Sequence, residues 1–296
     1  MTFKRTLRRG MSGSDVFYMK KKLFAAGYYA PAVSAVTHST FGNDTLLAVR
    51  AFQRVNLDGE GRRLATDGII GKKTWDAVLR ASSFERDADI PETIGALAAA
   101  AVTPALLRAD PVRRALVLDA LAFAFDPAVP ARYPYSLYIR GGNLYNSDLT
   151  QNVITPSRID AGAKRQPQYY DGGRKEMMIA AVQNDPDVTG ADCSGGIVGL
   201  MRVLGLCKPA FDATADMLCG NAHSADVAKK SLRPGDWAGR PQHIGLYVGG
   251  GYVVEWMGGE YGCQLSKLDD RRGFNFVSRK MQRRAAWTRF RRPHAY

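Results

Sequence analysis

The sequence has few of the residues that build disulfide scaffolds or metal centres. Its 296 residues include four cysteines and four histidines, and no two cysteines have the C-x-x-C spacing of a zinc site. The most apolar region, 94–125, is interrupted by Pro104 and by charged residues. We therefore expect a buried helical pair there and no transmembrane segment.

Acidic residues are scarce relative to basic ones. Asp and Glu number 28 against 41 Lys and Arg, which gives a net charge of +13, and basic residues concentrate in 4–22 and 271–292. This charge predicts a polyanionic partner such as nucleic acid, an anionic membrane or an acidic cell wall. Because no nucleic-acid recognition motif is present, we expect no nucleic-acid partner. The length and the ordinary hydrophobic content of 46% predict two globular domains.

Residues 5–80 carry three short helical patterns. Ser14 and Asn43 are predicted to cap the first two helices, Gly27 to end the first, and Asp67 to hydrogen-bond in a turn. The apolar faces are Val16, Met19 and Leu23 in the first helix, Thr45, Ala48, Val49 and Phe52 in the second, and Trp75, Val78 and Leu79 in the third.

This front part resembles the peptidoglycan-binding domain of many cell-wall hydrolases. The passages LRRGMSGSDVFYMKKKLFAAGYY, FGNDTLLAVRAFQ and DGIIGKKTW have the order and spacing of that family. Met19-Lys20 stands where the family usually has Leu-Gln, and Met still fills an apolar position. The resemblance implies that residues 1–80 bind the wall.

Residues 81–129 are predicted to be a connector. The polar stretch 81–92 has the composition of a linker, and Thr103-Pro104 and Asp110-Pro111 each look like an N-cap followed by Pro at the first helical position. The second helix, over 112–125, is apolar nearly all round, so we expect it to be buried against the C-terminal domain. No catalytic residue is predicted here.

Cys193 is the candidate nucleophile. In TGADCSGGIVGLMRVLG (189–205) it falls at the first turn of a predicted helix that Gly205 ends. Backbone N–H groups and the helix dipole at that position stabilise a thiolate, so we expect a lowered pKa for Cys193. The alternative is a small buried hydrophobic residue, which is how we interpret Cys207, Cys219 and Cys263.

His243 is the candidate base. It opens HIGLYVGGGYVVEW (243–256), which predicts a β-hairpin, and it shares a strand face with Gly245, which would leave room for a substrate backbone. If the loop centres on Gly249, His243 lies opposite Glu255, which would orient the imidazole. The alternative for Glu255 is an edge-strand carboxylate facing water. Asp236, in the turn RPGDW, is predicted to be structural.

Together these pieces resemble the NlpC-type, papain-like cysteine peptidases of bacterial cell walls. The family's third catalytic position, usually His, Asn or Gln, falls on Glu255. Its Tyr before a Gly-Gly pair falls on Tyr138, which would then lie beside the nucleophile. The other matching motifs are Asp192-Cys193-Ser194-Gly195, Pro234-Gly235-Asp236 and His243-Ile244-Gly245-Leu246-Tyr247.

This resemblance covers 130–296 and implies an α+β fold in which the helix bearing the cysteine packs on an antiparallel sheet. It departs from the family in 143–191, where the spacer before Cys193 is much longer than usual. The excess would be an insertion near the cleft that shapes specificity or acts as a lid. A surface loop without function is the alternative.

The resemblance implies a peptidoglycan hydrolase. The Cys193 thiolate would attack an amide of the stem peptide, His243 would move the proton, and the backbone N–H of Cys193 would bind the oxyanion. Asp192 and Ser194 would line the peptide subsite, and neither metal nor cofactor is expected. The family favours the bond between D-Glu and the diamino acid; the alternatives are an N-acetylmuramoyl-L-alanine amidase and a non-catalytic wall-binding protein.

The expected partners are peptidoglycan and anionic wall polymers. The basic amino terminus is not followed by an apolar stretch, so we expect no secretory signal. Such a hydrolase would be made in the cytoplasm and reach the wall after release, as a phage or prophage endolysin does. A toxin delivered by a secretion machine is the alternative.

Overall fold

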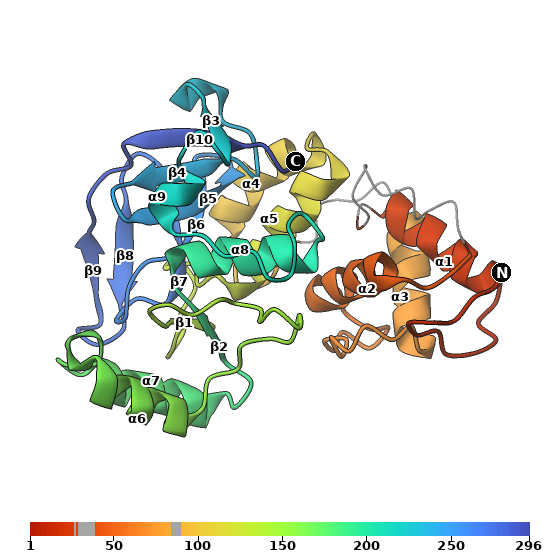
Figure 1. The fold of residues 1–296 in the computed structure, drawn as a ribbon, viewed down its shortest axis with the longest axis horizontal. Coiled ribbons are helices and arrows are strands. Elements are labelled where there is room, and N and C mark those ends of the chain that lie inside the picture. The colour runs from red at the N-terminus through yellow and green to blue at the C-terminus, as the bar shows by residue number, and fades with distance from the viewer. Residues whose placement is uncertain (27, 29–38, 84–89) are drawn as a thin grey trace.

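The structure is a computed structural model that describes the whole chain except residues 27, 29–38 and 84–89. It has a small helical part at the amino terminus and a larger part of mixed helices and strands beside it (Figure 1). Gly27, the predicted end of the first helix, lies outside the described residues, as does half of the predicted linker.

The amino-terminal part contains α1 (Ser14–Ala25), α2 (Asn43–Val55) and α3 (Lys72–Ser83). Their predicted apolar faces pack into one core. The side chain of Gln53 donates to Asp67 Oδ1 and to the Ile69 carbonyl, both at 2.9 Å, and Asp67 accepts from the Ile69 N–H, which confirms its predicted turn role. The predicted cap at Asn43 is wrong: Gly42 is the N-cap, and the Asn43 side chain accepts instead from Arg9.

Helices α4 (Ala96–Leu107) and α5 (Pro111–Phe123) follow. Asp110 caps α5 by accepting from the Arg113 N–H at 3.0 Å, as predicted. The predicted helix start at Thr103-Pro104 is wrong, because Pro104 lies inside α4 and Thr103 Oγ1 donates to the Ala99 carbonyl. The alanine-rich run before Pro104 has a helix propensity high enough to offset the hydrogen bond that Pro104 cannot make.

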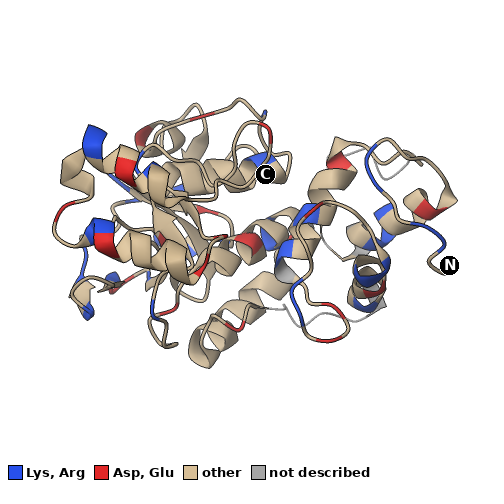
Figure 2. Ribbon diagram, turned by 90° about the horizontal axis from the view of Figure 1, so that it is seen from below, with Lys and Arg blue, Asp and Glu red and all other residues tan. Residues whose placement is uncertain are grey.

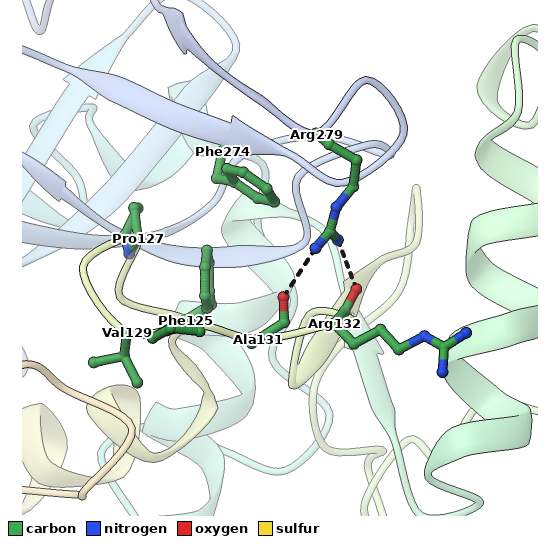
Figure 3. Close-up of a pocket in the computed structure, with 8 residues that line it drawn as sticks. Phe125, Pro127, Val129, Ala131, Arg132, Phe274 and Arg279 are labelled. Atoms are coloured by element: carbon green, nitrogen blue, oxygen red, sulfur yellow. Dashed lines mark hydrogen bonds between the residues drawn. The ribbon is translucent and has the colours of Figure 1, made fainter.

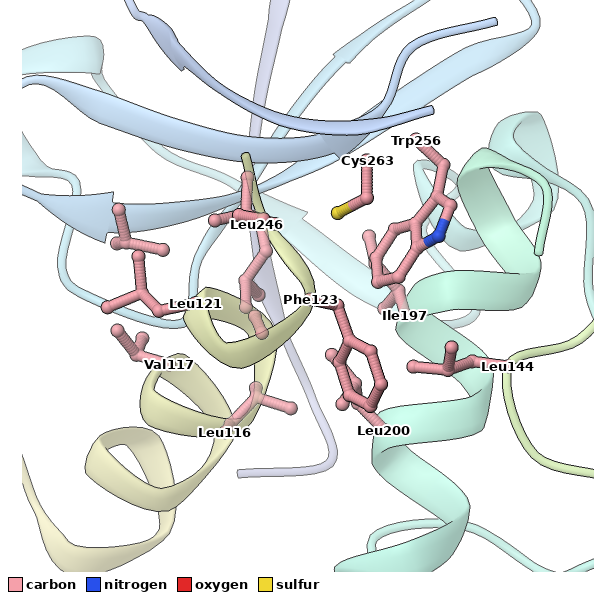
Figure 4. Packing of buried hydrophobic residues seen from close by; sticks show 14 of the residues in the cluster. Leu116, Val117, Leu121, Phe123, Leu144, Ile197, Leu200, Leu246, Trp256 and Cys263 are labelled. Atoms are coloured by element: carbon pink, nitrogen blue, oxygen red, sulfur yellow. The ribbon is translucent and has the colours of Figure 1, made fainter. Parts of the chain in front are cut away.

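An antiparallel sheet forms the centre of the larger part, with strands in the order β3, β10, β4, β5, β6, β7. Helix α8 (Cys193–Val203) packs against β5 and β6, and α5 packs beside it. Figure 4 shows the shared core, in which α5 and α8 side chains meet Leu246, Trp256 and Cys263 of the sheet. The bounds are β3 (Ser224–Asp226), β10 (Arg289–Pro293), β4 (Trp237–Arg240), β5 (His243–Gly249), β6 (Tyr252–Trp256) and β7 (Cys263–Lys267).

The long segment before α8 forms a second layer with its own core, away from the amino-terminal part (Figure 1). Strand β1 (Ser136–Tyr138) pairs in parallel with β2 (Thr189–Ala191), directly before Cys193. Between the two lie α6 (Pro156–Arg165), η2 (Pro167–Tyr169) and α7 (Arg174–Asn184). The remaining elements are α9 (Ala215–Leu218), η3 (Lys229–Ser231), β8 (Arg272–Asn275) and β9 (Lys280–Arg283).

The amino-terminal part docks on the larger part through α2, which packs on α5 and α8. Arg54 forms a buried ion pair with Asp119 of α5 at 3.3 Å, and its guanidinium lies 4.6 Å from the centre of the Tyr145 ring. Burial raises the pKa of Asp119 to about 7, although Arg54 opposes this rise. The contact fixes α2 against α5, which itself packs on α8.

A hollow of about 440 Å³ lies between residues 125–132 and the β8–β9 hairpin (Figure 3). Arg279 closes one side by donating to the Arg132 carbonyl at 2.8 Å, and its guanidinium lies 5.0 Å from the centre of the Phe274 ring. The Arg132 contact ties the hairpin to the segment that follows the connector. None of the helices in the described part of the chain combines the length and apolar character needed to cross a bilayer.

Candidate active site

Asp192 places Cys193 at the beginning of α8. Its Oδ1 accepts from the Gly195 N–H at 2.8 Å and its Oδ2 from the Gly141 N–H at 2.9 Å, so one carboxylate caps the helix and holds the end of β1. Ser194 Oγ donates to the same carboxylate at 3.1 Å. The two predicted subsite residues, Asp192 and Ser194, thus lie beside Cys193 and are hydrogen-bonded to each other.

Two glycines after Cys193 let α8 approach its neighbours closely. A Cβ on Gly195 would lie 2.0 Å from the Gly142 carbonyl oxygen, and one on Gly196 would lie 2.1 Å from the Trp256 ring. At the other end, Gly205 adopts φ +69° and ends the helix as predicted. The glycines therefore fix how near Cys193 lies to the sheet.

The Cys193 thiol is buried at the junction of α8 and β5, with 6% of the residue exposed. Its Sγ lies 3.8 Å from the Gln242 carbonyl oxygen, to which it donates. Burial and the nearby Asp192 charge raise the pKa of Cys193 to about 12, although the N–H groups of Ile244 and Ser194 act to lower it. The expected lowering is therefore wrong for this resting state, because loss of hydration outweighs the helix start.

His243 opens β5, and the residues on either side of it reach the thiol: Gln242 through its carbonyl and Ile244 through its N–H. The imidazole Nε2 is 2.7 Å from Glu255 Oε2. No hydrogen bond between Cys193 Sγ and the imidazole is present among the described residues. Burial lowers the pKa of His243 below 6.5, against the opposing effect of Glu255, so the imidazole is neutral at neutral pH.

The predicted hairpin is confirmed, but its predicted register is wrong. Leu246 pairs with Val254 and Tyr247 with Val253, and the register shifts at a bulge between Tyr247 and Gly249. This register sets Gly245, not His243, opposite Glu255. The His243 side chain reaches Glu255 diagonally, which is possible because both lie on one face of the sheet. The expected contact between His243 and Glu255 therefore forms, although the two residues are not directly paired across the hairpin as predicted.

Glu255 is fully buried on β6, between β5 and β7, so it is not an edge-strand carboxylate facing water. Besides His243, it accepts from Ser266 Oγ at 2.5 Å and from Arg271 Nε at 2.9 Å. Burial opposes ionisation, but the hydrogen bonds from His243 and Arg271 lower the pKa of Glu255 to about 2. Glu255 is therefore an anion held against the imidazole.

Arg271 and Trp287 complete this side of the site and were not predicted. The Trp287 ring stacks on His243 at 5.5 Å with an 11° tilt, and the Arg271 guanidinium lies 4.4 Å from the centre of the same indole. Trp287 also comes within 3.1 Å of where a Cβ of Gly245 would lie. The room expected beside Gly245 for a substrate backbone is thus filled by this indole and by Val253, which corrects that prediction.

Tyr138 lies close to Cys193, because its partner in the β1–β2 pairing is Ala191, two residues before the cysteine. Its ring lines a cleft of about 280 Å³ together with residues of the long segment 143–191 and of the loop after β6. The lining is completed by Arg140, Gln168, Tyr169, Tyr170, Arg174, Gly258, Gly259 and Glu260. The segment expected to be an insertion near the cleft therefore supplies part of its wall.

Asp236 is structural, as predicted. It is buried, accepts from the Arg233 N–H, and pairs with Arg113 of α5 and Arg292 of β10. Within the described residues, no three His, Cys, Asp or Glu side chains are grouped so that they could hold a metal ion.

Residues 12–78 match the family model described as a putative peptidoglycan binding domain. The resemblance expected for the amino-terminal part is thereby confirmed and indicates a protein associated with the cell wall. Neither the curated proteins nor the solved structures include a match to this chain.

Proposed function

We propose that the protein is a peptidoglycan hydrolase that cleaves an amide bond of the stem peptide with Cys193, His243 and Glu255. One observation carries this proposal. Cys193, at a helix start, is contacted by both chain neighbours of His243, and the Nε2 atom of that histidine is hydrogen-bonded to the buried Glu255 carboxylate. This order of nucleophile, base and orienting group is that of a catalytic triad, and it occurs in a chain with a wall-binding domain.

The proposed reaction begins from a neutral thiol and a neutral imidazole. When the substrate amide lies against Cys193, His243 Nδ1 takes the thiol proton as sulfur attacks the carbonyl carbon, and the Cys193 N–H binds the developing oxyanion. The imidazolium then protonates the leaving amine, and the C–N bond breaks to give a thioester. His243 next deprotonates a water that attacks the thioester, which releases the acid and restores the thiol.

Glu255 has two roles in this scheme. Its hydrogen bond to Nε2 orients the ring and leaves Nδ1 as the nitrogen that would take the thiol proton, and its negative charge would stabilise the imidazolium that forms in each step. Arg271 neutralises the carboxylate between turnovers, so His243 can stay an uncharged base.

The basic character of the chain supports a wall polymer as the partner. Lys and Arg occur on both the amino-terminal domain and the catalytic part (Figure 2), and the net charge is +13. Anionic wall polymers would concentrate such a protein at the wall. We expect this attraction to weaken at high salt.

Digestion of purified peptidoglycan, with fragments identified by mass spectrometry, tests the function. A new amino terminus on the diamino acid identifies the D-Glu–diamino acid endopeptidase that we favour. A new L-Ala amino terminus with free lactyl groups on the glycan identifies the N-acetylmuramoyl-L-alanine amidase. Wall binding without any fragments from several wall types would contradict the hydrolase and leave a binding protein.

A further inference from the structure

The cleft beside Tyr138 contains a guanidinium without an anionic partner. Arg140 lies over the Tyr169 ring, 4.6 Å from its centre, and makes no hydrogen bond or ion pair within the described part of the chain. The other arginine of the cleft differs, because Arg174 Nε donates to Glu260 at 2.8 Å. The cleft therefore has one cation whose charge is balanced internally and one whose charge is not.

Tyr138 adds a second unused polar group and connects the cleft to the nucleophile. No hydrogen bond of its hydroxyl occurs in the described residues. Burial raises the pKa of Tyr138, and the nearby Cys193 and Asp192 raise it further, so the hydroxyl stays protonated and can donate. A ligand that reaches from Arg140 past Tyr138 would arrive at Cys193.

We propose that Arg140, held by Tyr169, binds a carboxylate of the substrate peptide next to the scissile amide. This inference rests on the proposed function and names the feature of the substrate that the site selects. A guanidinium binds a carboxylate through two parallel N–H···O bonds, and the Tyr138 hydroxyl offers a further donor beside it. The preferred ligand is a stem peptide with free carboxylates rather than its carboxamide counterpart.

The segment 143–191 supplies residues that hold Arg140 and line the cleft. The Tyr169 ring lies 4.6 Å from the Arg140 guanidinium and supports it, and the Arg174–Glu260 pair, which also lines the cleft, is paired internally and does not compete for the carboxylate. A surface loop without function would supply no such contacts. The segment therefore determines substrate selection.

Binding is measured by calorimetry on the full-length Cys193→Ala protein with two synthetic stem peptides. One has its D-glutamate and diaminopimelate carboxylates free, and the other has both as carboxamides. We expect the free acid to bind about 10- to 100-fold more tightly, as a charge-assisted hydrogen bond predicts. Adding Arg140→Gln should remove that preference, and adding Arg283→Gln, an exposed arginine of β9 outside the cleft, should retain it.

Equal affinity for the two peptides, no measurable binding of either, or a preference that survives Arg140→Gln would overturn the subsite. Hydrolysis by the wild-type protein is measured separately with the same peptides. A retained preference without hydrolysis would refute the proposed reaction and leave the subsite standing. Hydrolysis without an Arg140-dependent preference would overturn the subsite and leave the proposed reaction standing.

Discussion

Replacing Arg271 by Met should damage the site in a way that its position predicts. The Arg271 side chain is 2% exposed and pairs with Glu255, which is fully buried, through Nε and Nη2. Breaking a buried ion pair by removing one partner costs about 3–5 kcal/mol of unfolding free energy. Arg272→Met is the matched control, because Arg272 is 53% exposed and pairs with the exposed Asp270, so its loss should cost less than about 1 kcal/mol.

The same substitution should change the pH dependence of hydrolysis. Arg271 lowers the pKa of His243, and without it the buried Glu255 anion favours the imidazolium as its counter-ion. The pKa of His243 then rises, and the acid limb of kcat/KM, which reports the free base, moves to higher pH. Urea unfolding and pH–rate profiles of both variants measure these effects. An unchanged acid limb in Arg271→Met would refute the electrostatic role given to Arg271.

Three further predictions follow from the contacts. Because Glu255 raises the pKa of His243, Glu255→Gln should move the acid limb of the pH–rate profile to lower pH, opposite to Arg271→Met. Glu255→Ala should lower activity more than Glu255→Gln does, because alanine cannot orient the imidazole ring. The pKa of Glu255, about 2, lies below its ordinary value of 4.5. The ionised carboxylate therefore stabilises the fold above about pH 4.5, and this stabilisation is lost as the pH falls toward 2. Between pH 6 and pH 3, urea unfolding should show a larger drop in unfolding free energy for the wild type than for Glu255→Gln. Gly196→Ala should lower the unfolding free energy by about 1–3 kcal/mol in urea titrations, because its Cβ would overlap Trp256. The control Gly251→Ala meets no neighbour but has a positive φ, so its unfolding free energy should fall only by the smaller cost of backbone strain.

Local patterns were enough to predict the helix that begins at Cys193, the hairpin of His243 and the wall-binding helices, since each depends on short-range periodicity and caps. The register of the hairpin could not be predicted from the sequence, because the bulge between Tyr247 and Gly249 depends on how three glycines close the turn. The Cys193 pKa was predicted in the wrong direction, because burial arises only when α8 packs on the sheet.

Arg271 and Trp287 were missed for a related reason. Arg271 stands in a basic run whose sequence pattern is typical of a solvent-exposed surface. Nothing local shows that its side chain turns inward to the Glu255 carboxylate sixteen residues earlier. Trp287 lies further along the chain and reaches His243 only when the sheet is complete. A buried glutamate in an apolar strand was the available signal that some cation must lie nearby.

The most direct test of the central claim is the rate of stem-peptide release from purified peptidoglycan by Cys193→Ala, with Cys207→Ala as the control. Cys207 is a partly exposed free cysteine outside the site, so its loss should leave the rate unchanged. We predict that Cys193→Ala still sediments with the wall and releases no peptide. Peptide release by Cys193→Ala at the wild-type rate would contradict the assignment of Cys193 as the nucleophile.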